Sequence, residues 1–347
     1  MYAASILALV AIQSVSGIAI KASQRGDAYA YDPLSAQCVA EAVKLGVAVA
    51  ATRLGPQRAY PWRVRLSRRQ ILNNAGLAAA YCFINEACFR VLERLDPATV
   101  SVFKSGGSIA SGVLAWALAG ERISRIQWTS IFMQTLGLVV VRHKDCSTTE
   151  QRKEAARDLA AFAGMPPEAL LLGSVVLAAL AGLANQVALR DPELKDMSMM
   201  VPNAYQYLAG VACNCGAYAA LGGSAATFFR GYDAGTGLVI ACQATVGLGI
   251  AFVLRHADNV ARTFASACAV AIQYFAYDVA WLRWRPSLLY ASGCGIVFAS
   301  CFLWIEGRTR DAAADAAPPL ADAGDEGGGI YDARAVEGGR ETDSHKV

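Results

Sequence analysis

Charged residues are scarce in this chain, at 17% of 347 residues, whereas soluble domains carry about a quarter. Only three histidines are present, and His143, His256 and His345 all fall in predicted loops or in the tail. No HExxH pair, no glycine-rich loop ending in Gly-Lys-Ser/Thr and no Gly-x-Ser-x-Gly elbow occurs. We therefore expect no enzyme, no metal site and no cofactor. The net charge of +3 is too small to favour nucleic-acid binding.

A disulfide framework is not expected either, although ten cysteines are present. Nine of them lie in apolar segments, where cysteine behaves as a small hydrophobic residue. Cys213 and Cys215 are too close in sequence for the usual spacing of a zinc pair.

Hydrophobic residues make up 55% of the chain and gather in blocks of about twenty residues, the length of a membrane-spanning helix. The blocks lack the alternation of a β-barrel, so we predict an all-α polytopic membrane protein. The first block lacks a basic leader and is interpreted as a span rather than a secretory signal. Ten transmembrane helices are predicted, at about 2–20, 34–52, 70–93, 98–119, 126–142, 168–189, 199–221, 236–254, 261–282 and 286–305.

The orientation follows from the loop between the second and third spans, which carries basic residues and no acidic residue. This loop is predicted to be cytosolic, which places both termini in the cytosol. The transporter domain is then residues 1–306, and residues 307–347, rich in Ala, Gly and acidic residues, form a disordered cytosolic tail. The basic residues are Arg53, Arg58, Arg63, Arg65, Arg68 and Arg69.

Two segments, starting at Asp96 and Asp258, follow the same pattern. In each, an aspartate that can cap a helix precedes a long helix rich in small residues, a basic turn and another apolar span. They would be the fourth and ninth helices of two inverted five-helix repeats, an arrangement found in many transporters.

Ionisable residues inside spans usually face a partner or a cavity. Glu41 and Lys44 are three residues apart on one helix face, which fits either a mutual ion pair or a lysine beside an anionic ligand. Lys104 lies deep in the fourth span, among small residues that suit helix contacts, and is predicted to contact a phosphate. Arg255 is interpreted as an interfacial anchor, and Arg262, one turn inside the ninth span, as a candidate for pointing into a cavity.

Amide and phenol side chains occur at helical spacing in two further spans. Tyr81 and Asn85 share one face of the third span, and Asn203 and Tyr207 share one face of the seventh, where Pro202 is expected to interrupt the helix. Such faces either join helices by hydrogen bonds or contact a ligand. With the buried cations, they favour an anionic ligand that carries phosphate and hydroxyl groups.

Specific strings resemble the nucleotide-sugar transporters of the CMP-sialic acid and UDP-galactose type. The most specific is the start of the ninth helix, which is similar to the family's Lys/Arg-x-x-Asp-Asn-x-x-Lys/Arg-x-Phe signature. The matching strings, in order from about residue 34 to 306, are AQCVAEAVKLGVAVA, ERISRIQWTSIFMQTLGLVVV, SMMVPNAYQYLAG, FFRGYD and VLRHADNVARTFASA.

The resemblance implies an antiporter of the Golgi membrane that exchanges a cytosolic nucleotide sugar, CMP- or UDP-linked, for a luminal nucleoside monophosphate. The endoplasmic reticulum and a homodimer stay open. Two alternatives remain: a carrier of another organic anion such as a sugar phosphate, and a non-transporting membrane scaffold. The family's ligand-binding residues match Lys44, Tyr81, Asn85, Asn203, Tyr207 and Arg262.

The sequence departs from the family pattern at three places. The lysine of the fourth helix aligns with Gly107, so Lys104, one turn earlier, is predicted to substitute for it. Two family lysines are Arg255 and Arg262 here, and arginine binds phosphate as a fork rather than as a point charge. In the third helix, a family glutamine is replaced by Ile84, and the asparagine after Asn85 by a glutamate. These changes leave the sugar specificity undetermined.

Overall fold

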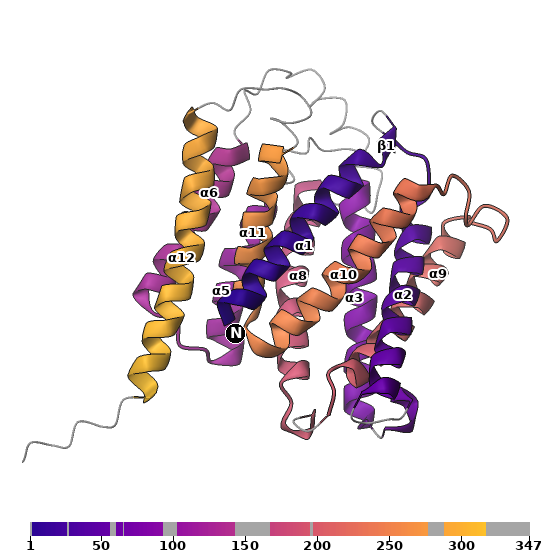
Figure 1. The fold of residues 1–347 in the computed structure, drawn as a ribbon, viewed down its shortest axis with the longest axis horizontal. Coiled ribbons are helices and arrows are strands. Elements are labelled where there is room, and N and C mark those ends of the chain that lie inside the picture. The colour runs from indigo at the N-terminus through magenta and orange to yellow at the C-terminus, as the bar shows by residue number, and fades with distance from the viewer. Residues whose placement is uncertain are drawn as a thin grey trace, which may run out of the picture.

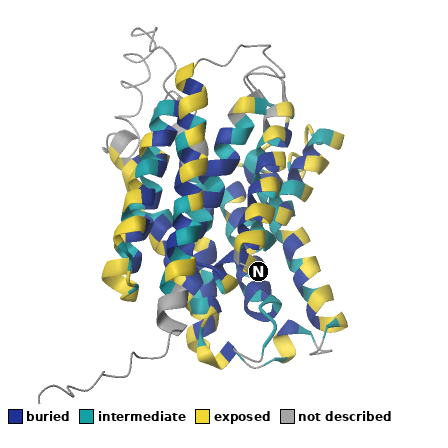
Figure 2. Ribbon diagram, turned by 60° about the vertical axis from the view of Figure 1, so that its left-hand side comes forward, coloured by how far each residue is buried: buried dark blue, intermediate teal, exposed yellow. Residues whose placement is uncertain are grey.

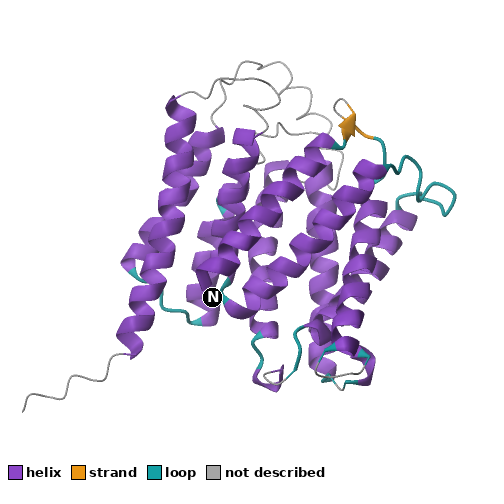
Figure 3. Ribbon diagram, viewed as in Figure 1, coloured by secondary structure: helices purple, strands orange, loops and turns teal. Residues whose placement is uncertain are grey.

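The computed structural model describes residues 2–25, 28–55, 60–64, 66–92, 103–142, 167–194, 197–276 and 288–316. In this part of the chain, ten α-helices lie side by side in a bundle (Figures 1 and 3). The helices are α1 Tyr2–Ala22, α2 Pro33–Leu54, α3 Arg68–Leu92, α5 Gly107–Ala119, α6 Arg125–Arg142, α8 Pro167–Leu189, α9 Met200–Ala220, α10 Ala234–His256, α11 Asn259–Phe275 and α12 Leu288–Ala316.

Three short elements lie between the helices. Two are 3-10 turns, Pro61–Arg63 and Pro192–Leu194. The third is an antiparallel hairpin of β1 Gln24–Arg25 and β2 Ala28–Tyr29, which the sequence patterns did not predict. The helical class of the chain is as predicted.

Several helix starts are fixed by aspartate caps. Asp32 accepts hydrogen bonds from the backbone of the first turn of α2, and Asp258 does the same for α11, as predicted. Pro202 does not interrupt α9, because it lies in the first turn, where a backbone N–H has no helical partner to lose. Asp96, the predicted cap of the other repeat, lies outside the described residues.

The last helix continues beyond the predicted end of the transporter domain. α12 runs through Ala316, so the first residues of the predicted tail are helical. This segment is rich in alanine, the best helix former, and Glu306 binds Arg310 one turn along at 2.6 Å. Residues 317–347 lie outside the described part. The N-terminus and the end of α12 lie at the same end of the bundle (Figure 1), which we call the terminus side.

The main core lies among α1, α5, α6, α10, α11 and α12. Phe264 and Trp304 are both buried there, with ring centroids 5.2 Å apart. α6 and α12 come especially close, because a Cβ atom on Gly137 would lie 3.1 Å from the backbone N of Val297 and one on Gly293 would lie 2.8 Å from that of Val141. Small residues at such contacts let membrane helices approach backbone to backbone.

In the part of the chain that the structure describes, five helices are long and apolar enough to cross a membrane: Ala3–Ile20, Pro33–Leu54, Leu171–Leu189, Ala234–His256 and Leu288–Asp311. Large apolar side chains such as Leu7, Leu172 and Phe302 are exposed along the helices (Figure 2), as expected for a surface that faces lipid. α3 and α9 have 25 and 21 residues but are not among the five. Their polar residues lower the hydropathy, and these include four predicted site residues.

Candidate functional site

The clearest sign of a ligand site is a row of buried polar atoms on α9. Asn203 is 1% exposed and Tyr207 4% exposed, yet the amide nitrogen of the first and the hydroxyl of the second have no hydrogen-bond partner within the described residues. A side-chain oxygen of Gln206 and one of Asn214 are also unpaired. Because an unpaired buried polar group destabilises a protein by about 1–3 kcal/mol, these atoms are best explained by a ligand or water.

Lys44 lies against this row from α2. Its Nζ is 4.9 Å from the centroid of the Tyr207 ring and 2.5 Å from Oε1 of Glu41. Of the two alternatives that the sequence left open, the ion pair is therefore present in this structure. Lys44 remains beside the unpaired polar atoms, so it also keeps the position that a ligand contact requires.

Two glycines make room for this ion pair. A Cβ atom on Gly210 of α9 would lie 3.0 Å from the carboxyl group of Glu41, and one on Gly247 of α10 would lie 2.7 Å from Cδ of Lys44. The sequence analysis missed both residues. Gly210 follows Tyr207 at a spacing of three, on the face that carries Asn203, so helical periodicity could have identified it.

Tyr81 and Asn85 come from α3, and both are partly buried. Tyr81 lies close enough to Tyr207 and to Arg262 to interact electrostatically with each of them. Tyr81 is therefore the link between the α9 row and α11. Asn85 lies one turn further along α3, on the face of Tyr81.

Arg262 lies in the first turn of α11 and is partly buried. Its Nε donates to Oδ1 of Asn259 at 2.9 Å. Within the described residues, no carboxylate lies within ion-pair distance of Arg262. Its guanidinium thus retains donors and a charge for an anionic ligand.

Lys104 lies in a short helical segment before α5, and its side chain is exposed. A side chain at position 107, where the family lysine aligns, would instead meet Val175 of α8 at 3.7 Å. The predicted substitution of Lys104 for that lysine therefore changes the surroundings of the charge. Its contact with a phosphate stays a prediction.

The Asp-Asn pair of the α11 signature belongs to a polar network on the terminus side. Oδ2 of Asp258 accepts from Arg308 of α12 at 2.7 Å, and Arg308 also contacts Glu121, in the α5–α6 connection, at 3.4 Å. Gln186 of α8 donates to Glu121 at 2.6 Å and accepts from the backbone N–H of Asn259 at 2.6 Å. No sequence pattern pointed to Glu121, Gln186 or Arg308.

Arg255 holds the α8–α9 connection, and its second terminal nitrogen is buried without a hydrogen-bond partner within the described residues. Its guanidinium donates to the backbone oxygens of Leu194 at 3.2 Å and Met197 at 3.1 Å. The predicted role of Arg255 as an interfacial anchor stays a prediction.

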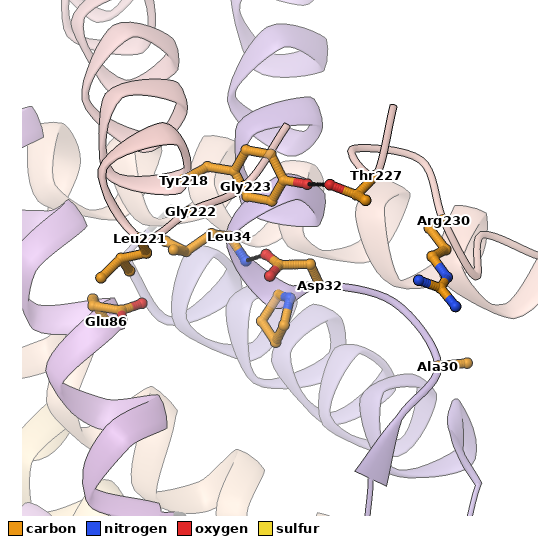
Figure 4. Close-up of a pocket in the computed structure, with 11 residues that line it drawn as sticks. Ala30, Asp32, Leu34, Glu86, Tyr218, Leu221, Gly222, Gly223, Thr227 and Arg230 are labelled. Atoms are coloured by element: carbon orange, nitrogen blue, oxygen red, sulfur yellow. Dashed lines mark hydrogen bonds between the residues drawn. The ribbon is translucent and has the colours of Figure 1, made fainter. Parts of the chain in front are cut away.

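A pocket of about 490 Å³ lies beside the start of α2 and the end of α9 (Figure 4). These helix ends lie at the opposite end of the bundle from the terminus side (Figure 1). The pocket is bounded by the start of α2, the end of α3, the end of α9 and the loop after it. Figure 4 shows Glu86 on one wall and Arg230 on another, with Asp32 between them. The pocket therefore presents both signs of charge. Glu86 follows Asn85 directly in α3, but neither Asn85 nor Tyr81 lines this pocket.

Comparisons with known proteins identify the family of this chain. The sequence model of the nucleotide-sugar transporter family matches residues 1–305. The chain belongs to this family. It is 23% identical over 309 residues to CMP-sialic acid transporter 4 of Arabidopsis thaliana, covering 87% of this chain and 84% of the relative.

Other relatives are named after different nucleotide sugars. The UDP-N-acetylglucosamine/UDP-N-acetylgalactosamine transporter nstp-4 of Caenorhabditis elegans is 25% identical, over 69% of this chain and 70% of that protein. The UDP-galactose transporter senju of Drosophila melanogaster is 22% identical, over 72% of each. A solved crystal structure at 14% identity superposes with a TM-score of 0.65 over 88% of this chain and 97% of that one. This last likeness concerns the fold alone.

Proposed function

We propose that this family member is an antiporter of the Golgi membrane that exchanges a cytosolic CMP- or UDP-linked sugar for a luminal nucleoside monophosphate. The observation that carries the proposal is the set of buried polar atoms of Asn203 and Tyr207 that have no partner within the described residues, with Lys44 beside the Tyr207 ring. Arg262 is linked to Tyr207 through Tyr81, which interacts electrostatically with both. Donors and acceptors beside cations suit a ligand that combines a phosphate with a base and sugar hydroxyls.

Alternating access requires two parts that move relative to each other, and we propose two inverted halves, α1–α6 and α8–α12. The helix contacts support this division, because equivalent helices have equivalent neighbours. α1 packs on α10 and α11, and α8, at the matching position of the second half, packs on α3 and α5. Likewise α2 contacts α10, whereas α9 contacts α3. α1 and α8 run in opposite directions (Figure 1), as inversion requires.

In this mechanism, Lys44, Lys104 and Arg262 neutralise the phosphate groups. Tyr81, Asn85, Asn203 and Tyr207 hold the base, ribose or sugar. Reorientation of the empty protein is disfavoured because Arg262 has no carboxylate partner within the described residues, whereas a bound anion offsets its charge. For this reason, entry of the nucleotide sugar is coupled to exit of the nucleoside monophosphate.

The proposal is tested with purified protein in proteoliposomes. Vesicles preloaded with CMP, UMP or GMP receive external radiolabelled CMP-sialic acid or UDP-sugars, and we expect one nucleotide sugar to enter faster when the matching monophosphate is inside. Exchange of sugar phosphates without competition by nucleotides would instead indicate a different anion carrier. No exchange of any of these compounds would favour a scaffold.

Charge reversal tests the least certain residue of the site. Lys104→Glu is expected to reduce uptake of the preferred nucleotide sugar by about tenfold or more, because a carboxylate would then face the phosphate. Arg310→Gln is the matched control, since Arg310 is an exposed cation paired on its own helix. If Lys104→Glu leaves the uptake of every nucleotide sugar unchanged, the assigned role of Lys104 is wrong.

Residence in the Golgi is tested by imaging the full-length protein with markers of both compartments. Signal that coincides with the endoplasmic reticulum marker would contradict the proposed location without affecting the transport assay.

A further inference from the structure

A continuous series of polar contacts leads from Arg262 to the terminus-side end of the bundle. Nε of Arg262 donates to the side chain of Asn259 at 2.9 Å. The backbone N–H of Asn259 donates to Oε1 of Gln186, whose Nε2 donates to Oε1 of Glu121, both at 2.6 Å. The other oxygen of Glu121 contacts Arg308 at 3.4 Å.

These contacts differ in whether they cross between the two proposed halves. Arg308, Asp258 and Gln186 belong to the second half, as do Asn259 and Arg262. Glu121 belongs to the first half, so its contacts with Gln186 and Arg308 are cross-half contacts. Separation of the halves on the terminus side must break them.

The network is partly buried, and burial strengthens its polar contacts. Asp258 is 1% exposed, while the side chains of Arg308 and Glu121 are 29% and 20% exposed. Arg308 keeps its shorter contact, with Asp258 at 2.7 Å, when Glu121 leaves. The charge of Arg308 thus remains compensated in both arrangements, which makes the Glu121 contact reversible.

Asn259 is held by groups from two other helices. Its amide nitrogen donates to Oγ of Ser111 in α5 at 3.3 Å and to the backbone oxygen of Ala179 in α8 at 3.4 Å. A Cβ atom on Gly182 of α8 would lie 2.2 Å from its side-chain oxygen, so α8 leaves room for this side chain only by having a glycine there. The orientation of Asn259, and with it the position of Arg262, therefore depends on how α5 and α8 sit.

We propose that Glu121, Gln186 and Arg308 form a latch that holds the terminus side closed, and that Asn259 is a positioning residue that connects this latch to Arg262. The latch rests on the proposed transport function. It names the residues through which ligand binding affects one end of the transport pathway. In the present structure the latch is formed, while the 490 Å³ pocket lies at the other end. A ligand that binds Arg262 competes for its contact with Asn259 and so biases the latch.

Hydrogen exchange of the purified full-length protein tests the latch without any ligand. In Glu121→Gln, which keeps the shape of the side chain but removes its charge, we expect the amides of 119–126 and 257–262 to exchange roughly tenfold faster. The control is Glu306→Gln, which removes an exposed carboxylate of α12 whose partner, Arg310, lies on the same helix. Arg308→Lys should give an intermediate rate, because it keeps the charge but loses the forked geometry.

Two results would overturn the latch. One is exchange in Glu121→Gln that matches the wild type or Glu306→Gln. The other is faster exchange in every helix with a lowered melting temperature, which would mean that Glu121 has only a structural role.

The link to Arg262 has a separate readout. A nucleotide that stabilises the wild type against heat should also change exchange in 119–126, and Gln186→Met should remove this change while the stabilisation persists. An unaltered response in Gln186→Met contradicts the link. If no nucleotide stabilises the wild type, the proposed function fails, whereas the ligand-free comparison of Glu121→Gln still decides the latch.

Discussion

Buried polar residues on α9 and at the start of α11 differ in whether they have hydrogen-bond partners. At the start of α11, Asp258 and Asn259 have partners on two or more other helices. On α9, Asn203 and Tyr207 are as deeply buried, but a polar atom of each has no partner within the described residues. The first group holds the protein together, and the second is available for hydrogen bonds to a ligand or water. The difference lies in the hydrogen-bond partners and not in residue type or burial.

The largest expected effect is loss of stability at the paired site. Asp258→Ala should lower the melting temperature by roughly 5–10 °C, because it removes a buried ion pair and a helix cap. Thermal unfolding of the ligand-free protein measures this. Asp258→Asn keeps the capping oxygen and should lie between Asp258→Ala and the wild type. A melting temperature equal to that of the wild type in both variants would mean that the network does not stabilise the fold.

The opposite behaviour is expected at the unpaired site. Tyr207→Phe should leave the melting temperature of the ligand-free protein unchanged, since the lost hydroxyl has no partner among the residues that the structure describes. It should weaken nucleotide binding by about threefold to tenfold. Tyr290→Phe is the matched control, because Tyr290 is equally buried but donates to the backbone oxygen of Ala271 at 3.3 Å. The control should lose stability and keep affinity. The comparison fails if both variants behave alike.

The smallest effect is expected at Glu41, which belongs to neither group. Glu41→Gln should strengthen nucleotide binding by roughly threefold at low salt, because Lys44 no longer divides its charge between Glu41 and the ligand. Binding titrations at two salt concentrations measure this. Weaker binding in Glu41→Gln would mean that Glu41 orients Lys44 for the ligand rather than competing with it.

The helices themselves were largely predictable from the sequence. Apolar blocks gave α2, α6 and α8 to within two residues at each end, because a membrane span has a fixed length and few charges. The end of α12 was missed, since its Ala-rich continuation has the composition of a tail as well as that of a helix. The two-residue strands of the hairpin are too short to give a pattern.

The site was predictable in its residue types and less so in its contacts. Spacing placed Asn203 and Tyr207 on one face, but a spacing of three between Glu41 and Lys44 fits both an ion pair and a ligand contact. Glu121 and Arg308 are 187 residues apart, so no local pattern could pair them. The roles of Gly210 and Gly247 depend on side chains from a different helix and appear only when the helices are assembled.

The glycine contacts between α6 and α12 have a consequence for any motion of the protein. Each helix ends one of the proposed halves, and at Gly137 and Gly293 the backbone of one helix lies directly against backbone and side-chain atoms of the other. At such a contact the two helices can rotate slightly but have little room to slide or separate. We therefore expect the two halves to rock against each other with α6 and α12 kept in contact, and with the greatest displacement far from this contact, where α2 meets α9.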